Sequence, residues 1–137
     1  MLKSAMPSPK PASVAAAFAA FPAPVRKKLD RIRALIFEVA GKTDGVGPLT
    51  ETLKWGEPAY LTGATKSGST VRLGRSRRAP DSAAVFFICT TNLVPTFRSL
   101  WPELRYEGDR AILLPLDGEV PAPLTACIKM ALTYHQR

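Results

Sequence analysis

The chain has 137 residues, a formal net charge of +8 and a hydrophobic content of 46%. This length suits one domain with a buried core, and no apolar run approaches the roughly 20 residues that a membrane span needs, which excludes a membrane protein. The basic balance favours anionic ligands or nucleic acid over cationic partners, although net charge informs solubility more than fold.

The first twelve residues contain three prolines and two lysines but no apolar stretch of the kind that a signal peptide needs. We therefore expect residues 1–12 to form a disordered arm, residues 13–137 to form a single domain, and the protein to be cytoplasmic. The alanine-rich run at 14–21 predicts a short helix. Cys89 and Cys127 lie in apolar runs and are expected to be buried, reduced thiols.

From Pro22 onward apolar residues recur every three or four positions, which predicts a long helix that stops near Gly41. One buried stripe should face the core, and the basic residues should fall on the other faces. The expected core residues are Leu29, Ile32, Ile36 and Val39, and the expected outward residues are Arg26, Lys27, Arg31 and Arg33.

Residues 50–60 read TETLKWGEPAY, and the segment 49–55 allows two interpretations. As a strand it would place Glu51 on the same face as Leu53 and Trp55, so a carboxylate would lie among apolar neighbours. As a short helix it lets Glu51 face water, and we prefer the helix because it avoids a buried charge.

After Pro58 the chain has the pattern of four or five strands, with 85–89 as a central strand and 105–116 as a hairpin that turns at Gly108 and Asp109. Helices are expected between Asn92 and Pro102 and at the C-terminal end. These elements predict the α+β class: a single two-layer domain with a mostly antiparallel sheet of four to five strands, and a long N-terminal helix and a C-terminal helix packed on it.

Signatures of catalysis and metal binding are missing from the sequence. The single histidine, His135, lies near the C-terminus, and two separated cysteines cannot complete a zinc site. The segment GATKSG lacks the spacing of a phosphate-binding loop and is expected to be a hairpin turn. We therefore predict no enzyme activity, no cofactor and no metal.

The run RLGRSRRAP places four arginines within seven positions. Guanidinium groups form paired hydrogen bonds with phosphates and carboxylates, so this run is the sharpest sign of anion binding. The favoured interpretation is still a solvated loop that discourages edge pairing. No aromatic residue interrupts the run, which disfavours nucleic acid. The four residues are Arg72, Arg75, Arg77 and Arg78.

The string E-x-L-x-W-G-x-P-x-Y at residues 51–60, which follows a long amphipathic helix opening with Phe21-Pro22, resembles the YdhG-like family of bacterial domains of unknown function. The likeness covers most of residues 15–135 and implies a compact α+β domain. Some members are described as frataxin-like iron chaperones. The resemblance therefore implies intracellular iron binding as an alternative function, with Glu51 and Glu57 as the carboxylates to test.

The preferred hypothesis is a non-enzymatic binding module for an anionic small molecule or a protein partner, with nucleic acid less favoured and both a monomer and a homodimer open. Arg72 and Arg75 would contact the anion, and Trp55 and Tyr60 would form an aromatic wall. An enzyme with an acid–base site at Tyr60, Lys54 and Glu51 ranks lowest. The candidate ligand-binding residues are Glu51, Lys54, Trp55, Tyr60, Arg72 and Arg75.

For the 51–60 motif itself, a purely structural interpretation is favoured. In it Trp55 packs into the core, Gly56 supplies a left-handed residue at the end of a helical turn, and Pro58 stiffens the start of the next strand.

Overall fold

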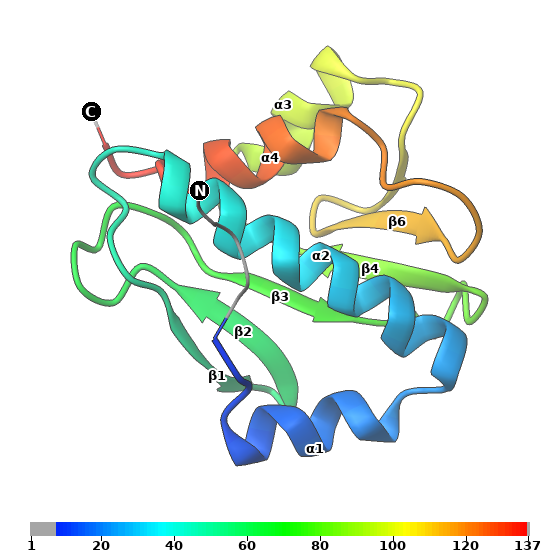
Figure 1. Cartoon of the computed structure of the whole chain (residues 1–137). Coiled ribbons are helices and arrows are strands. Elements are labelled where there is room, and N and C mark those ends of the chain that lie inside the picture. Colours follow the sequence, from blue (N-terminus) through cyan, green and yellow to red (C-terminus); the bar gives the residue numbers. More distant parts are fainter. Residues whose placement is uncertain (1–7, 137) are drawn as a thin grey trace.

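The computed structural model describes residues 8–136, which form four helices and one six-stranded antiparallel sheet (Figure 1). The α+β class predicted from the sequence is confirmed. In chain order the elements are α1 (Ala12–Ala20), α2 (Ala23–Lys42), β1 (Thr50–Lys54), β2 (Glu57–Leu61), β3 (Val71–Gly74), β4 (Ser82–Phe86), α3 (Leu93–Leu100), β5 (Arg105–Glu107), β6 (Ala111–Pro115) and α4 (Pro123–Leu132).

The strands lie in the order β1-β2-β3-β4-β6-β5. β4 lies inside the sheet between β3 and β6, and all of its residues are buried, as expected for a central strand; it covers Ser82–Phe86, however, and not the predicted 85–89. β5 and β6 form the predicted hairpin. The sheet has six strands where four to five were expected, because residues 50–54 form an additional strand.

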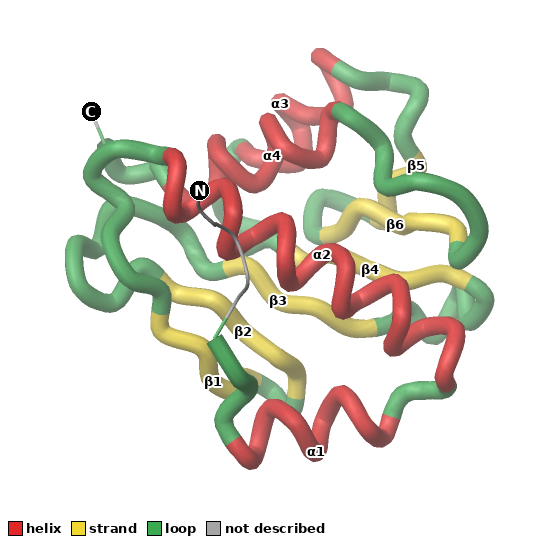
Figure 2. The backbone as a smooth tube through the Cα atoms, in the orientation of Figure 1, coloured by secondary structure: helices red, strands yellow, loops and turns green. Residues whose placement is uncertain are grey.

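The helices pack against one face of the sheet (Figure 2). α1 contacts β1 and β2, α2 contacts β4 and α4, and α3 contacts α4. One apolar core joins residues of all four helices to alternate residues of the strands, including the four predicted on α2. Among residues 8–136, the other face carries only a small apolar cluster. We call it the open face, and its cluster is Ala84, Phe86, Ala111 and Leu113.

The predicted helix over 49–55 is wrong, because Thr50–Lys54 is a strand in which Glu51 pairs with Tyr60 of β2. The strand does turn the Glu51 carboxylate toward the core, but Arg33 meets it there with two hydrogen bonds of 2.5 and 2.7 Å. The outward position expected for Arg33 is therefore also wrong, since this residue is 5% exposed. The opposite charge of Arg33 offsets much of the penalty that argued for a helix.

Two further expectations concern the cysteines and the N-terminal arm. Cys89 is exposed, contrary to the expectation, because β4 ends at Phe86, before this residue. Cys127 is buried as expected, and burial raises the pKa of its thiol to about 12. Of the predicted arm, residues 1–7 lie outside the described residues. The residues that follow contact the domain: the Nζ atom of Lys10 lies 2.8 Å from the carboxylate Oδ1 of Asp30 in α2. Among residues 8–136, no helix has the length and apolar character to cross a membrane.

Candidate functional site

Two residues, Trp55 and Gly56, form the whole loop between β1 and β2. Their φ angles are 57° and 77°, and the flanking Lys54 and Glu57 pair across the hairpin. A two-residue loop with positive φ at both positions is the type I′ turn, where Asn-Gly or Asp-Gly is usual. Trp55 thus takes a position that a bulky side chain rarely occupies, and the left-handed backbone costs about 1–2 kcal/mol.

The Trp55 side chain is 90% exposed, the highest value among the large hydrophobic residues of the described chain. The interpretation in which this ring packs into the core is therefore wrong. A large exposed ring on a strained backbone contributes nothing to the core, and strain of this kind concentrates at functional positions. Trp55 is for this reason the first residue of the candidate site.

Behind Trp55 a hollow of about 500 Å³ opens beside the open face. It combines apolar surface with two guanidinium groups and one carboxylate, so it suits a ligand with both planar and anionic parts. The lining residues are Trp55, Glu57, Arg72, Phe87, Ile88, Cys89 and Arg110.

Glu57 and Arg72 pair inside this hollow, with 2.5 Å between the guanidinium Nη1 and the carboxylate Oε1. Gly74 leaves room for this pair, because a Cβ at this position would overlap the second carboxylate oxygen of Glu57. Burial raises the pKa of the Glu57 carboxyl, and the charges of Arg72 and Arg110 oppose that shift. Glu57 therefore occupies one arginine that an external anion would otherwise contact.

The Phe86 ring supports two arginines on the open face. The guanidinium carbons of Arg72 and Arg110 lie 5.2 and 5.1 Å from the centre of this ring. Contacts of this kind hold the flat guanidinium groups in place while leaving their N–H donors available.

A second hollow of about 390 Å³ continues from the first and shares Glu57 and Arg110 with it. Its other side is the loop after β3, where the hydroxyl of Ser76 donates to the carboxylate of Glu107. The side chains of Arg75, Arg77 and Arg78 line this hollow and are exposed. We call Arg72, Arg75, Arg77, Arg78 and Arg110 the arginine strip.

The arginine strip holds more positive charge than its own carboxylates neutralise. Within residues 8–136, the guanidinium groups of Arg75, Arg77 and Arg78 make no ion pair and no hydrogen bond, and only the backbone N–H of Arg78 donates to the Ser76 hydroxyl. Five arginines face two glutamates along the two hollows. The open face is thus an electropositive surface with an exposed indole at one end.

On the opposite face of the hairpin, Arg33, Glu51 and Tyr60 form a buried polar cluster. The Tyr60 hydroxyl donates to the Glu51 carboxylate over 2.9 Å, and Arg33 donates to it twice. Hydrogen bonding to Glu51 raises the pKa of Arg33, and burial, followed by the Glu51 charge, raises the pKa of Tyr60. All three groups satisfy one another, so this cluster is structural.

The six residues predicted as ligand contacts therefore divide between the two faces. Trp55 and Arg72 line the first hollow and Arg75 lines the second, while Lys54 is exposed opposite Glu57. Glu51 and Tyr60 face the helices. The aromatic wall of Trp55 and Tyr60 is wrong, because alternate residues of a strand point to opposite faces and Tyr60 has no exposed surface.

Arg110 was missed as a site residue by the sequence reasoning. Arg110 is distant in sequence from the RLGRSRRAP run. It lies beside that run in the fold because the Arg110 carbonyl accepts a hydrogen bond of 2.7 Å from the backbone N–H of Phe87, just after β4. No local pattern carries that information.

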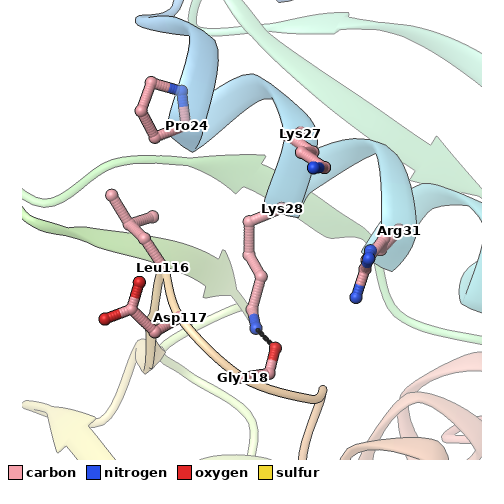
Figure 3. A pocket seen from close by; sticks show the side chains of 7 residues that line it. All are labelled: Pro24, Lys27, Lys28, Arg31, Leu116, Asp117 and Gly118. Carbon is pink, nitrogen blue, oxygen red and sulfur yellow. Dashed lines mark hydrogen bonds between the residues drawn. The ribbon is translucent and has the colours of Figure 1, made fainter.

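Another hollow, of about 260 Å³, lies between α2 and the loop after β6 (Figure 3). Lys28 points into it and donates to the Gly118 carbonyl over 2.9 Å, while the Asp117 carboxylate points away from the ammonium. Lys28 is only 3% exposed, so its charge serves to hold the loop against α2. Lys27 and Arg31 beside it are exposed.

Comparisons of the chain with protein-family models, with curated proteins and with solved structures gave no match. The candidate site therefore depends on the geometry described above.

Proposed function

We propose that this protein is a non-enzymatic binding module that holds an anionic ligand or partner on its open face. The observation that carries the proposal is the arginine strip beside the exposed Trp55. Three of its guanidinium groups are exposed without a partner among the described residues, and Phe86 orients two more. Guanidinium groups gathered on one surface bind phosphates, sulfates and carboxylates through several charge-assisted hydrogen bonds.

Iron binding, the alternative that the YdhG-like resemblance implies, stays a prediction, as do membership of that family and a cytoplasmic location. Glu51 and Glu57, the carboxylates named for iron, each pair with an arginine. In residues 8–136 no group of three or more His, Cys, Asp or Glu side chains is placed to hold a metal ion. No observation favours iron over an anion, so the anion is our proposal.

The test is a thermal-shift and calorimetry panel of anions: pyrophosphate, a nucleoside triphosphate, heparin and short oligonucleotides. The site variant replaces Arg75 and Arg77 with Gln. Its matched control replaces Lys27 and Arg31 with Gln, which removes the same charge from exposed positions of α2. A ligand of the folded state raises its melting temperature, so binding appears without knowledge of the natural ligand.

We expect at least one anion to stabilise the wild type and the control variant, and to stabilise the Arg75/Arg77 variant much less. Equal losses in the two variants would assign the effect to net charge, which contradicts a site on the open face. A panel in which no anion binds the wild type would also overturn the proposal.

A further inference from the structure

We infer that the anionic ligand is a single-stranded nucleic acid, with one base stacked on Trp55 and the phosphates following the arginine strip. This inference rests on the proposed function and adds the class of ligand to it. The observations are the exposed indole, the five arginines that line two adjoining hollows, and the position of these arginines on a sheet face.

Trp55 is well placed to stack on a nucleic-acid base. Its ring is 90% exposed at the tip of a tight turn, so its position is set by the hairpin while its faces stay open. Every base has a flat π face, and aromatic residues on such surfaces stack bases of any sequence. The hollow next to Trp55 adds Ile88 and two arginines, a mixture that fits a base and the phosphate attached to it.

The strip has enough separate guanidinium groups to favour a polyanion over a small anion. The two hollows share Glu57 and Arg110 and together run from Trp55 to the exposed Arg77 and Arg78. Three exposed guanidinium groups without partners make weak sites individually, because water solvates them well. A chain of phosphates contacts several at once and releases its condensed counterions, so the contributions add.

The surface also favours a single strand over a duplex. An exposed ring stacks only on a base that is not already stacked between its neighbours in a double helix. Sheet faces with basic and aromatic residues bind unpaired strands in other nucleic-acid-binding folds, whereas duplex grooves accept a helix or a narrow ribbon. The absence of an aromatic residue within RLGRSRRAP, which disfavoured nucleic acid at the level of sequence, is offset by the exposed Trp55 ring in the β1–β2 turn.

The experiment measures fluorescence anisotropy of a labelled twelve-nucleotide oligothymidylate, titrated with the full chain at several salt concentrations. We expect saturable binding, with a slope of log affinity against log salt near −2 to −3 for about four phosphate contacts. Replacing Arg75 and Arg77 with Gln should reduce the size of that slope by roughly 1.4.

The Trp55→Ala variant should bind the oligonucleotide about 10-fold more weakly or worse, while Trp55→Phe should keep most of the affinity because it keeps a ring. Leu100→Ala is the matched control, since Leu100 is 54% exposed on α3 outside both hollows. It should bind as the wild type does. A Trp55→Ala variant with unchanged affinity would overturn the stacking.

Further outcomes separate this inference from the proposed function. If a duplex of the same length binds as tightly as the single strand, with no dependence on Trp55, the single-strand inference is wrong. If no oligonucleotide binds but pyrophosphate or heparin stabilises the wild type through Arg75 and Arg77, the inference fails while the proposed function stands. If no anion binds, both fail.

Discussion

Tyr60 donates its phenolic hydrogen to Glu51 across the β1–β2 hairpin, over 2.9 Å, and the two residues are direct cross-strand partners. The same carboxylate accepts two hydrogen bonds from Arg33 of α2. Side-chain exposure of Arg33 and Glu51 is 6% each, so the ion pair lies almost entirely out of water. The cluster therefore connects the hairpin that carries Trp55 to the longest helix.

Glu51→Ala should lower the free energy of unfolding by about 3–5 kcal/mol, because it leaves the Arg33 charge buried without a counter-charge. Urea unfolding followed by circular dichroism measures this change. The triple variant Arg33→Met, Glu51→Leu and Tyr60→Phe should recover most of the loss, since it removes both charges together with the hydroxyl that would otherwise lose its acceptor.

The control for this prediction is Glu38→Ala. Glu38 pairs with Lys42 on the surface of α2, and the two side chains are 42% and 73% exposed. An exposed pair of this kind contributes roughly 0.3–0.5 kcal/mol. Equal losses in Glu51→Ala and Glu38→Ala would contradict the role of the buried cluster.

Tyr60→Phe should lower the free energy of unfolding at neutral pH by about 1.5–3 kcal/mol, through loss of a hydrogen bond to a charged group. Burial holds the pKa of Tyr60 above its ordinary value, so the folded protein keeps this proton at a pH where the unfolded chain loses it. The contribution of the hydroxyl is complete below about pH 10 and is lost as the pH rises above that value.

Unfolding of the wild type and of Tyr60→Phe should therefore be compared from about pH 9 to about pH 11. Their difference should shrink above about pH 10 by up to about 1.4 kcal/mol per pH unit. A difference that stays constant over this range would mean that Tyr60 is not held protonated in the fold. Other groups that lose protons there are common to both proteins.

The same hairpin shows where sequence reasoning succeeded and where it failed. The stripe of α2 and the apolar run that begins in β4 are local patterns, and both elements were predicted. The strand at 50–54 was rejected because Glu51 was treated as an unpaired charge, and its partner is 18 positions away on a helix. A sign was present, since Arg33 lies four positions after Leu29 and three before Ile36, on the buried stripe.

The candidate site was predictable only in part. RLGRSRRAP identified four residues of the arginine strip by composition alone. Arg110 and Phe86 join them through strand pairing, which short-range patterns do not encode. The two-residue hairpin turn at Trp55-Gly56 could not be predicted from the sequence, because Trp occupies the position at which Asn or Asp is typical of such a turn.

Trp55→Asn should raise the free energy of unfolding by about 0.5–1 kcal/mol, because Asn tolerates the left-handed backbone that Trp55 adopts at φ 57°. Trp55→Ala keeps the unfavourable backbone and removes an exposed ring, so it should change stability by less than about 0.5 kcal/mol. Thermal and urea unfolding measure both variants.

Both Trp55 variants should lose affinity for the anionic ligand to a similar extent, since both lack the ring. A gain in stability with a loss of binding would show that the turn sequence serves function at the expense of stability. A Trp55→Ala variant destabilised by several kcal/mol would instead mean that the ring is buried in solution.

Glu57→Gln should strengthen anion binding, because it removes the carboxylate that holds Arg72 at 2.5 Å and returns one cation to the strip. Heparin affinity should rise several-fold, and the salt dependence should become steeper by about one contact. Glu119→Gln makes the same change of charge at an exposed residue outside both hollows and should leave the affinity nearly unchanged.

The pH dependence of heparin binding by the wild type tests the same competition between Glu57 and the ligand for Arg72, without a mutation that changes the net charge. Because burial raises the pKa of Glu57, this carboxyl takes up its proton at a higher pH than an ordinary glutamate. Protonation releases Arg72, so heparin affinity of the wild type should increase as the pH falls from neutral toward the range in which ordinary glutamates titrate, while the sulfates of heparin stay ionised. The Glu57→Gln variant should show less of this increase, since its competitor is already neutral. Identical pH profiles for the two proteins would mean that Glu57 does not compete with the ligand for Arg72.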